Sequence, residues 1–92
     1  MRSELVEIYS DATNAAIMRH PGRRFPGVLV QGDTLNALCR QADRACSDAR
    51  IVLDEDAYLE LTDLRDHLHQ LRAHYRSVMA DHGLTLPFVD PP

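Results

Sequence analysis

The sequence contains no lysine and no tryptophan, and only 5% of its 92 residues are aromatic. The absence of lysine excludes Schiff-base catalysis and the lysine of a phosphate-binding P-loop. No apolar run approaches the about 18 residues that a membrane span needs, and the chain does not open with the basic and apolar segments of a signal peptide. We therefore expect a cytoplasmic protein without a membrane partner.

Cysteine is also scarce, with only Cys39 and Cys46 in the chain. They lie seven residues apart in a segment with helical periodicity, so about 10 Å would separate them along the helix axis. A disulfide needs Cα atoms within about 7 Å of each other. The two cysteines are therefore expected to be buried free thiols, which are typical of a reducing compartment.

Positive charge is limited as well, because ten arginines oppose 14 acidic residues for a net charge of −4. Affinity for nucleic acid depends on cationic side chains, so we expect no nucleic-acid partner. With 45% apolar and 26% charged residues, the 92-residue chain has the composition of one folded domain. His67 and His74 are too far apart on a helix to share one ion, and no serine or cysteine has an evident base. We expect no metal, no cofactor and no catalysis.

Two helices are predicted by apolar residues at alternating spacings of three and four. The first covers 34–50, with Asp33 as its N-cap, and the second covers 55–82, between Asp54 as N-cap and Gly83. The short connection between them predicts an antiparallel hairpin. The residues expected to be buried in its core are Leu35, Leu38, Ala42, Leu61, Leu64, Leu68 and Leu71.

Residues 1–32 are less regular and favour short strands. Val28–Val30 is rich in β-branched residues, and Ala15–Arg19 could pair with it through a loop containing two Pro-Gly turns. Val6–Tyr9 is a candidate third strand, although a helix over 4–18 fits nearly as well.

The predicted fold class is α+β, a single domain over 1–92 in which a β-hairpin or three-stranded sheet packs on the helical hairpin. An all-α fold is the alternative. Residues 84–92 are expected to be an extended tail, because Pro87, Pro91 and Pro92 keep that segment out of a helix.

Acidic residues are concentrated around the start of the second helix. Seven of them lie between Asp48 and Asp66, with Arg50 and Arg65 as the only cations among them. They either cap and solvate the helix or meet a cationic partner. Leu59 lies opposite the main apolar stripe and is a candidate exposed anchor. The candidate partner-binding residues are Asp54, Glu55, Asp56, Leu59, Glu60, Asp63 and Asp66.

A loop containing Arg23, Arg24 and Phe25 is the second candidate contact surface, because its guanidinium groups suit an anion. In the structural alternative, Phe25 packs under the helical hairpin. Arg76 and His82 have the spacing of the R-x(4–6)-H ribonuclease motif of HEPN domains, a two-residue match. A minimal HEPN-like ribonuclease is therefore kept as an alternative function.

Three segments together resemble a known family. Residues 14–35 fit the signature N-x-A-x-x-R-x-P-G-R-x-F-P-G-x-x-x-Q-G-D-[ST]-L of a family of small bacterial proteins, and 73–75 and 81–88 resemble its H-Y and H-G-x-x-L-P-[YF] segments. The resemblance implies an immunity protein of a polymorphic toxin system, and it brings no catalytic residues. The expected function is a binding module that neutralises a cognate toxin by occluding its active site. A small homodimeric regulatory or scaffold protein is the alternative non-catalytic function.

Overall fold

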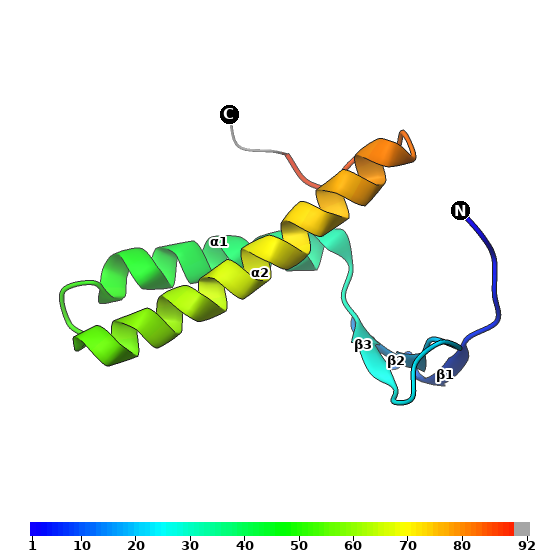
Figure 1. The fold of residues 1–92 in the computed structure, drawn as a ribbon, viewed down its shortest axis with the longest axis horizontal. Helices are drawn as coiled ribbons and strands as arrows, with labels where there is room; N and C mark the ends of the chain where they lie inside the picture. Colours follow the sequence, from blue (N-terminus) through cyan, green and yellow to red (C-terminus); the bar gives the residue numbers. More distant parts are fainter. Residues whose placement is uncertain (90–92) are drawn as a thin grey trace. The chain divides into compact units, whose positions relative to one another are not determined.

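The computed structural model describes residues 1–89 and divides into two compact units. The first unit, up to Gln31, contains a three-stranded sheet, and the second, from Gly32, contains two helices (Figure 1). This is the predicted α+β class, and the all-α alternative is wrong.

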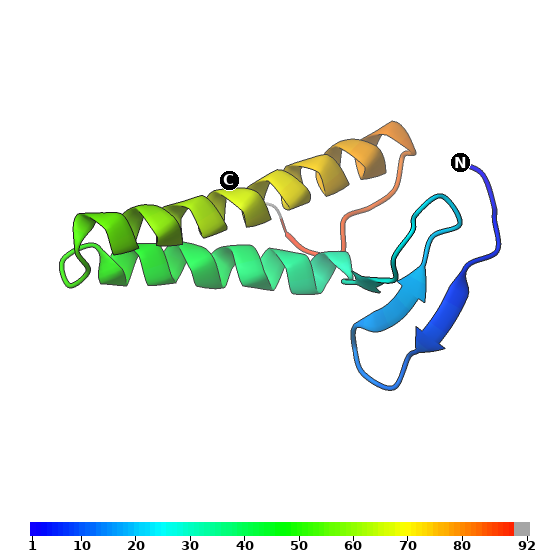
Figure 2. The ribbon, with the colours of Figure 1, turned by 60° about the horizontal axis from the view of Figure 1, so that its bottom comes forward.

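The two helices are antiparallel neighbours. Helix α1 covers Gly32–Ala49 and helix α2 covers Glu55–Asp81, and both views show them side by side with a short loop between them (Figures 1 and 2). Both pairs of bounds lie within two residues of the predicted ones. The helical hairpin is therefore confirmed.

The caps of α2 are also as predicted. The carboxylate of Asp54 accepts a hydrogen bond from the backbone N–H of Ala57 at 2.8 Å. At the other end Gly83 has φ 65°, and the N–H of Leu84 donates to the carbonyl of Met79 at 2.9 Å, which completes a Schellman-type end. Only a residue that tolerates the left-handed region can end the helix in this way.

The cap predicted for α1 is wrong. The helix begins at Gly32, so Asp33 lies inside the first turn and its carboxylate accepts from the adjacent N–H of Thr34 at 2.9 Å. Its charge still lies at the positive end of the helix dipole, which favours this end electrostatically.

The sheet is a small antiparallel meander. Strands β1 (Glu7–Ser10), β2 (Ala16–Arg19) and β3 (Gly27–Leu29) pair in the order β1-β2-β3. The strand interpretation of the N-terminal segment is therefore correct, and the helix over 4–18 is not formed. The loop between β2 and β3 contains a turn in which the N–H of Arg23 donates to the carbonyl of His20 at 2.9 Å.

One ion pair links β1 and β2. Glu7 lies directly opposite Arg19 in the register, and the two side chains form a salt bridge. The hydrogen bond from Arg19, helped by one from Tyr9, holds the pKa of Glu7 below its ordinary value. The pair therefore stabilises the sheet fully at pH values above the ordinary pKa of a glutamate. This contribution is lost as the pH falls through the lowered pKa of Glu7.

The seam between the helices is lined by small side chains on α1. Cys39, Ala42 and Cys46 are buried, and both cysteines are free. The thiol of Cys39 lies 3.3 Å from the carbonyl oxygen of Leu68, and burial raises its pKa. Cys39 is thus held as a neutral thiol that packs and weakly donates, as expected for a buried cysteine rather than a nucleophile.

Most of the predicted leucine core is not buried. Of the seven residues expected in the core, only Ala42 is buried. The half-buried ones are Leu35, Leu61 and Leu68, and the exposed ones are Leu38, Leu64 and Leu71. A pair of helices encloses only the narrow strip where they face each other. Side chains a little off that strip have no neighbouring element over them.

A polar network occupies one edge of the seam instead. Arg72 is buried and donates from Nη1 to the amide oxygen of buried Asn36 at 2.9 Å, and its Nη2 lies 3.4 Å from Nδ1 of His69. The other ring nitrogen of His69 lies 2.7 Å from a carboxylate oxygen of Asp43. The buried guanidinium is therefore satisfied by a neutral amide and an imidazole.

Gly32 is buried where Tyr75 crosses the start of α1. A Cβ atom at Gly32 would overlap the ring and hydroxyl of Tyr75, which also packs against Phe88 with ring centroids 6.4 Å apart. The absence of a side chain at Gly32 is what lets the two helices and the tail meet at this point.

Gly32→Ala is expected to lower the free energy of unfolding by about 1–3 kcal/mol, because the added methyl displaces the Tyr75 ring. Gly32 does not have positive φ, so alanine would otherwise stabilise the helix by about 0.5–1 kcal/mol. In a Tyr75→Ala background the sign should reverse. Urea denaturation of the four proteins of this cycle measures the coupling, and equal effects in both backgrounds would contradict the overlap.

The tail only partly covers the helices. Leu86 and Phe88 are half-buried, whereas Leu84 and Val89 are exposed. The last three residues of the predicted extended tail, including Pro91 and Pro92, lie outside the described residues.

Candidate functional site

The loop between α1 and α2 exposes apolar side chains at the end of the hairpin. Ile51 is 92% exposed and Val52 is 78% exposed. The backbone is fixed, since the N–H groups of Val52 and Leu53 donate to the carbonyl of Ala49 at 3.1 and 3.0 Å. The loop therefore presents two large apolar side chains on a hydrogen-bonded turn.

Acidic side chains surround this turn on the first turns of α2. Glu55, Asp56, Glu60 and Asp63 are all exposed, and within residues 1–89 none of the four forms an ion pair. Leu59 lies among them and is 52% exposed, as predicted from its position on the helix. We call the set formed by these residues the acidic tip: Ile51, Val52, Glu55, Asp56, Leu59, Glu60 and Asp63.

Two acids of the predicted contact set already have intramolecular roles. Asp54 caps α2, and Asp66 accepts from Nε and Nη2 of Arg65 at 3.2 and 3.1 Å. Asp54 therefore fits the capping interpretation, and Asp66 is partly neutralised. These two residues are less suited to a partner than the four unpaired acids.

From the sequence, Ile51 and Val52 were assigned no part in a contact surface. A signal for their exposure was present, because a loop of this length places its middle residues beyond both helix ends, where the seam cannot reach them. Two β-branched apolar residues at such a place indicate a contact surface rather than a core.

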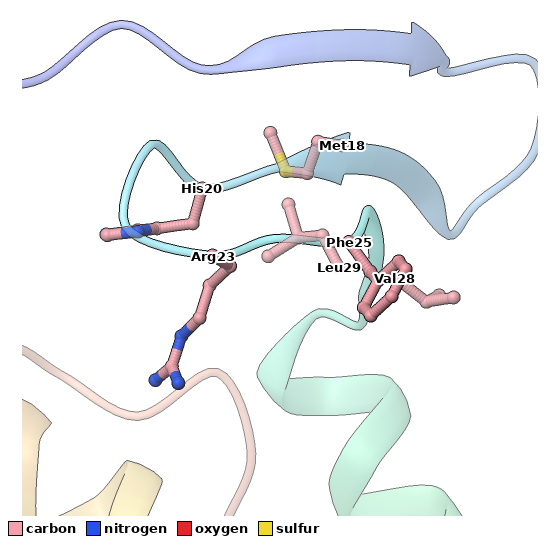
Figure 3. A pocket seen from close by; sticks show the side chains of 7 residues that line it. Met18, His20, Arg23, Phe25, Val28 and Leu29 are labelled. Atoms are coloured by element: carbon pink, nitrogen blue, oxygen red, sulfur yellow. The ribbon is translucent and has the colours of Figure 1, made fainter.

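The second candidate surface is the loop between β2 and β3. An open hollow of about 210 Å³ lies beside it (Figure 3). This hollow is smaller than the about 300–1,000 Å³ of typical cofactor pockets. Its size fits a single side chain of a partner better than a small-molecule ligand. The lining residues are Met18, His20, Arg23, Phe25, Gly27, Val28 and Leu29.

Phe25 is the aromatic side chain of this loop, and the sheet unit itself leaves it uncovered. The side chain is 71% exposed, and the guanidinium of Arg24 lies 5.3 Å from its ring centre in a cation–π contact. The guanidinium of Arg24 therefore already has an intramolecular partner. Arg23 is the arginine of this loop whose side chain lines the hollow.

The residues of the proposed ribonuclease pattern have local contacts. Arg76 is half-buried with its guanidinium 5.7 Å from the centre of the Phe88 ring, and His82 is the exposed C-cap of α2. Across residues 1–89 no three His, Cys, Asp or Glu side chains gather as a metal site would require. The described part of the chain also contains no helix that is long and apolar enough to span a membrane.

A comparison with protein families gives a match over almost the whole chain. The model of a family of unknown function, DUF6959, covers residues 1–88. The chain belongs to the DUF6959 family. No curated protein and no solved structure matches it.

The structure of this DUF6959 protein joins two of the segments noted in its sequence. Gly32 comes from the Q-G-D segment and Tyr75 from the H-Y segment, and these two residues meet at the start of α1. Neither contributes to the acidic tip, so these motif residues serve the packing of the hairpin.

Proposed function

We propose that this DUF6959 protein is a non-catalytic binding module whose acidic tip contacts a basic surface of another protein. The observation that carries the proposal is the combination of four unpaired acids with exposed Ile51, Val52 and Leu59 at one end of the hairpin. Apolar anchors ringed by charge are the usual composition of a protein contact surface.

Each part of the acidic tip has a separate physical role in such a contact. The acids attract a cationic surface from a distance and raise the association rate, since complementary fields steer the encounter. Ile51, Val52 and Leu59 are desolvated in the complex and lower the dissociation rate. Because the tip projects from two packed helices, little conformational entropy is lost on binding.

The partner that we propose is a toxin domain with a basic surface, neutralised in the cytoplasm by occlusion of its active site. The resemblance of the 14–35 segment to immunity proteins supports this choice, and an acidic inhibitor of net charge −4 is suited to a basic enzyme. In this proposal exposed Ile51 and Val52, in the loop at the end of the hairpin, enter the active-site cleft.

The test is binding to a toxin domain encoded beside this gene, combined with survival of cells that express it. Leu59→Asp is expected to increase the dissociation rate at least tenfold and to remove protection, because a charge replaces an apolar anchor that is desolvated in the complex. Leu84→Asp is the matched control, since Leu84 is also exposed and follows the other end of α2. Equal binding by both variants would contradict the proposal.

A further inference from the structure

A second exposed apolar surface lies along the helical hairpin. Leu38 of α1 is 39% exposed, and on α2 the exposed fractions of Leu64, Leu71 and Val78 are 55%, 59% and 40%. These four side chains were expected in the core or on the apolar stripe. We call them the apolar face.

The four residues lie on one side of the helix pair. On α2, Leu64 and Leu71 are on the opposite side of the seam from His69, and on α1 Leu38 is on the opposite side from Asp43. Asp43 and His69 contact each other at 2.7 Å, so they mark one edge of the seam. The leucines of both helices therefore flank the other edge and form a continuous surface.

The spacing of the apolar face is that of a helix packed against another helix. Ala57, Leu64, Leu71 and Val78 recur every seven residues, beside a first line formed by Leu61, Leu68 and Tyr75 at the seam. In a four-helix bundle each helix contacts two neighbours and needs two such lines. Within residues 1–89 the buried apolar side chains are only Cys39, Ala42 and Cys46. Oligomerisation is one of the ways in which a core this small is completed.

The pattern on α2 is also symmetric about its centre. Leu64 and Val78 each lie seven residues from Leu71. When two copies of α2 pack antiparallel across a twofold axis at Leu71, Leu64 of each copy meets Val78 of the other, so the surface is complementary to itself. We propose that the apolar face binds a second copy of this chain, giving a four-helix bundle in which the two Leu71 side chains meet.

The available area agrees with this occupant. The helices overlap over the 18 residues of α1, which is about 27 Å, and two packed helices are about 20 Å across. The flat area is thus roughly 500 Å² per copy, and projecting side chains increase the accessible area towards the about 800 Å² per partner of stable interfaces. With the twofold axis at Leu71 the two copies of α2 overlap over residues 61–81, so Leu64, Leu71 and Val78 are all covered, while the start of α2 extends beyond the second copy.

Sedimentation of the full chain tests the dimer. The wild type is expected to sediment with twice its mass of 10.4 kDa at micromolar concentration. Leu71→Arg should raise the dimer dissociation constant at least about 100-fold, because the symmetric interface receives the charge twice. Leu59→Arg is the matched control, since it charges a similarly exposed leucine about 120° round α2 from Leu71 and should leave the dimer intact.

Cross-linking tests the geometry independently of stability. Leu71→Cys is expected to form an intermolecular disulfide in mild oxidant, because residues on the twofold axis come within about 7 Å, whereas Leu59→Cys should not. The native cysteines are buried and do not compete. A wild-type monomer at 100 µM, a dimer that survives Leu71→Arg, or equal cross-linking of both cysteine variants would each overturn the proposal.

The dimer does not depend on the proposed function. Leu71→Arg should still bind the basic partner through the acidic tip, and Leu59→Asp should still form the dimer. Loss of both properties in either variant with an unchanged circular dichroism spectrum would show that the two surfaces are one, and that would contradict the separate apolar face.

Discussion

Asn36→Leu is expected to lower the free energy of unfolding by about 2–3 kcal/mol, although it adds an apolar side chain of similar branching to a buried site. Asn36 accepts a hydrogen bond from Arg72, and both side chains are buried. Without the amide oxygen, the charged guanidinium stays buried and its remaining side-chain partner is Nδ1 of His69, 3.4 Å from Nη2. An unsatisfied buried cation costs more than the leucine contributes.

The double variant Asn36→Leu/Arg72→Met separates this cause from a steric one. Replacing both partners by apolar groups removes the buried charge, so its stability should return to within about 1 kcal/mol of the wild type. Arg40→Met, at an exposed position of α1, is the control and should change stability by at most about 0.5 kcal/mol. Urea denaturation at one fixed protein concentration measures all four proteins. If Asn36→Leu is as stable as the wild type, water rather than Asn36 satisfies Arg72.

The secondary structure could be predicted from the sequence because its determinants are local. Asp54 and Gly83 have the chemistry of a cap and a left-handed helix end, and both act in these roles. The strands followed from the β-branched segment Val28–Val30, the Pro-Gly turns before it and the short apolar segments upstream that can pair with it. Asp33 was misplaced because the true first residue, Gly32, gives no side-chain signal for a helix start.

The core could not be predicted from the sequence because periodicity identifies an apolar face but not its neighbour. Leu64 and Leu71 belong to the apolar stripe expected in the core. The half-buried leucines at the seam are instead Leu61 and Leu68, which lie three residues before them and about 60° round the helix. Arg72 was not considered for burial because arginine is usually exposed. Its long apolar stem fits the seam beside small α1 side chains, and Asn36 satisfies its head.

The candidate site was predictable in its charges but not in its anchors. Exposed acids at the start of α2 and exposed Leu59 followed from helix geometry, whereas Ile51 and Val52 needed the loop conformation. The acidic tip and the apolar face use different residues of the hairpin, so one chain has room to bind a copy of itself and a basic partner at once.

Reversal of Asp56, Glu60 and Asp63 to arginine is expected to weaken binding of the basic partner by several kcal/mol, because each change replaces attraction by repulsion at the contact. These three acids are exposed and form no ion pair within residues 1–89, so we expect the fold to be kept, with a cost of about 0.3–1 kcal/mol for a cation at Asp56 in the first turn of α2. Reversal of Glu4, Asp11 and Asp81 alters the net charge equally and is the matched control. Surface plasmon resonance with circular dichroism as a check of folding measures both triple variants.

Ionic strength distinguishes a charged contact from a general effect of net charge. Raising salt from about 0.05 to 0.5 M shortens the Debye length from roughly 14 Å to about 4 Å, so the wild-type association rate should fall steeply. The tip variant should lose this dependence, and the control variant should keep most of it because steering acts through the charges nearest the contact. Leu59→Asp should instead change mainly the dissociation rate. If the tip variant binds as tightly as the wild type at low salt, the acids of α2 are solvated surface and the contact lies at the loop of Arg23 and Phe25.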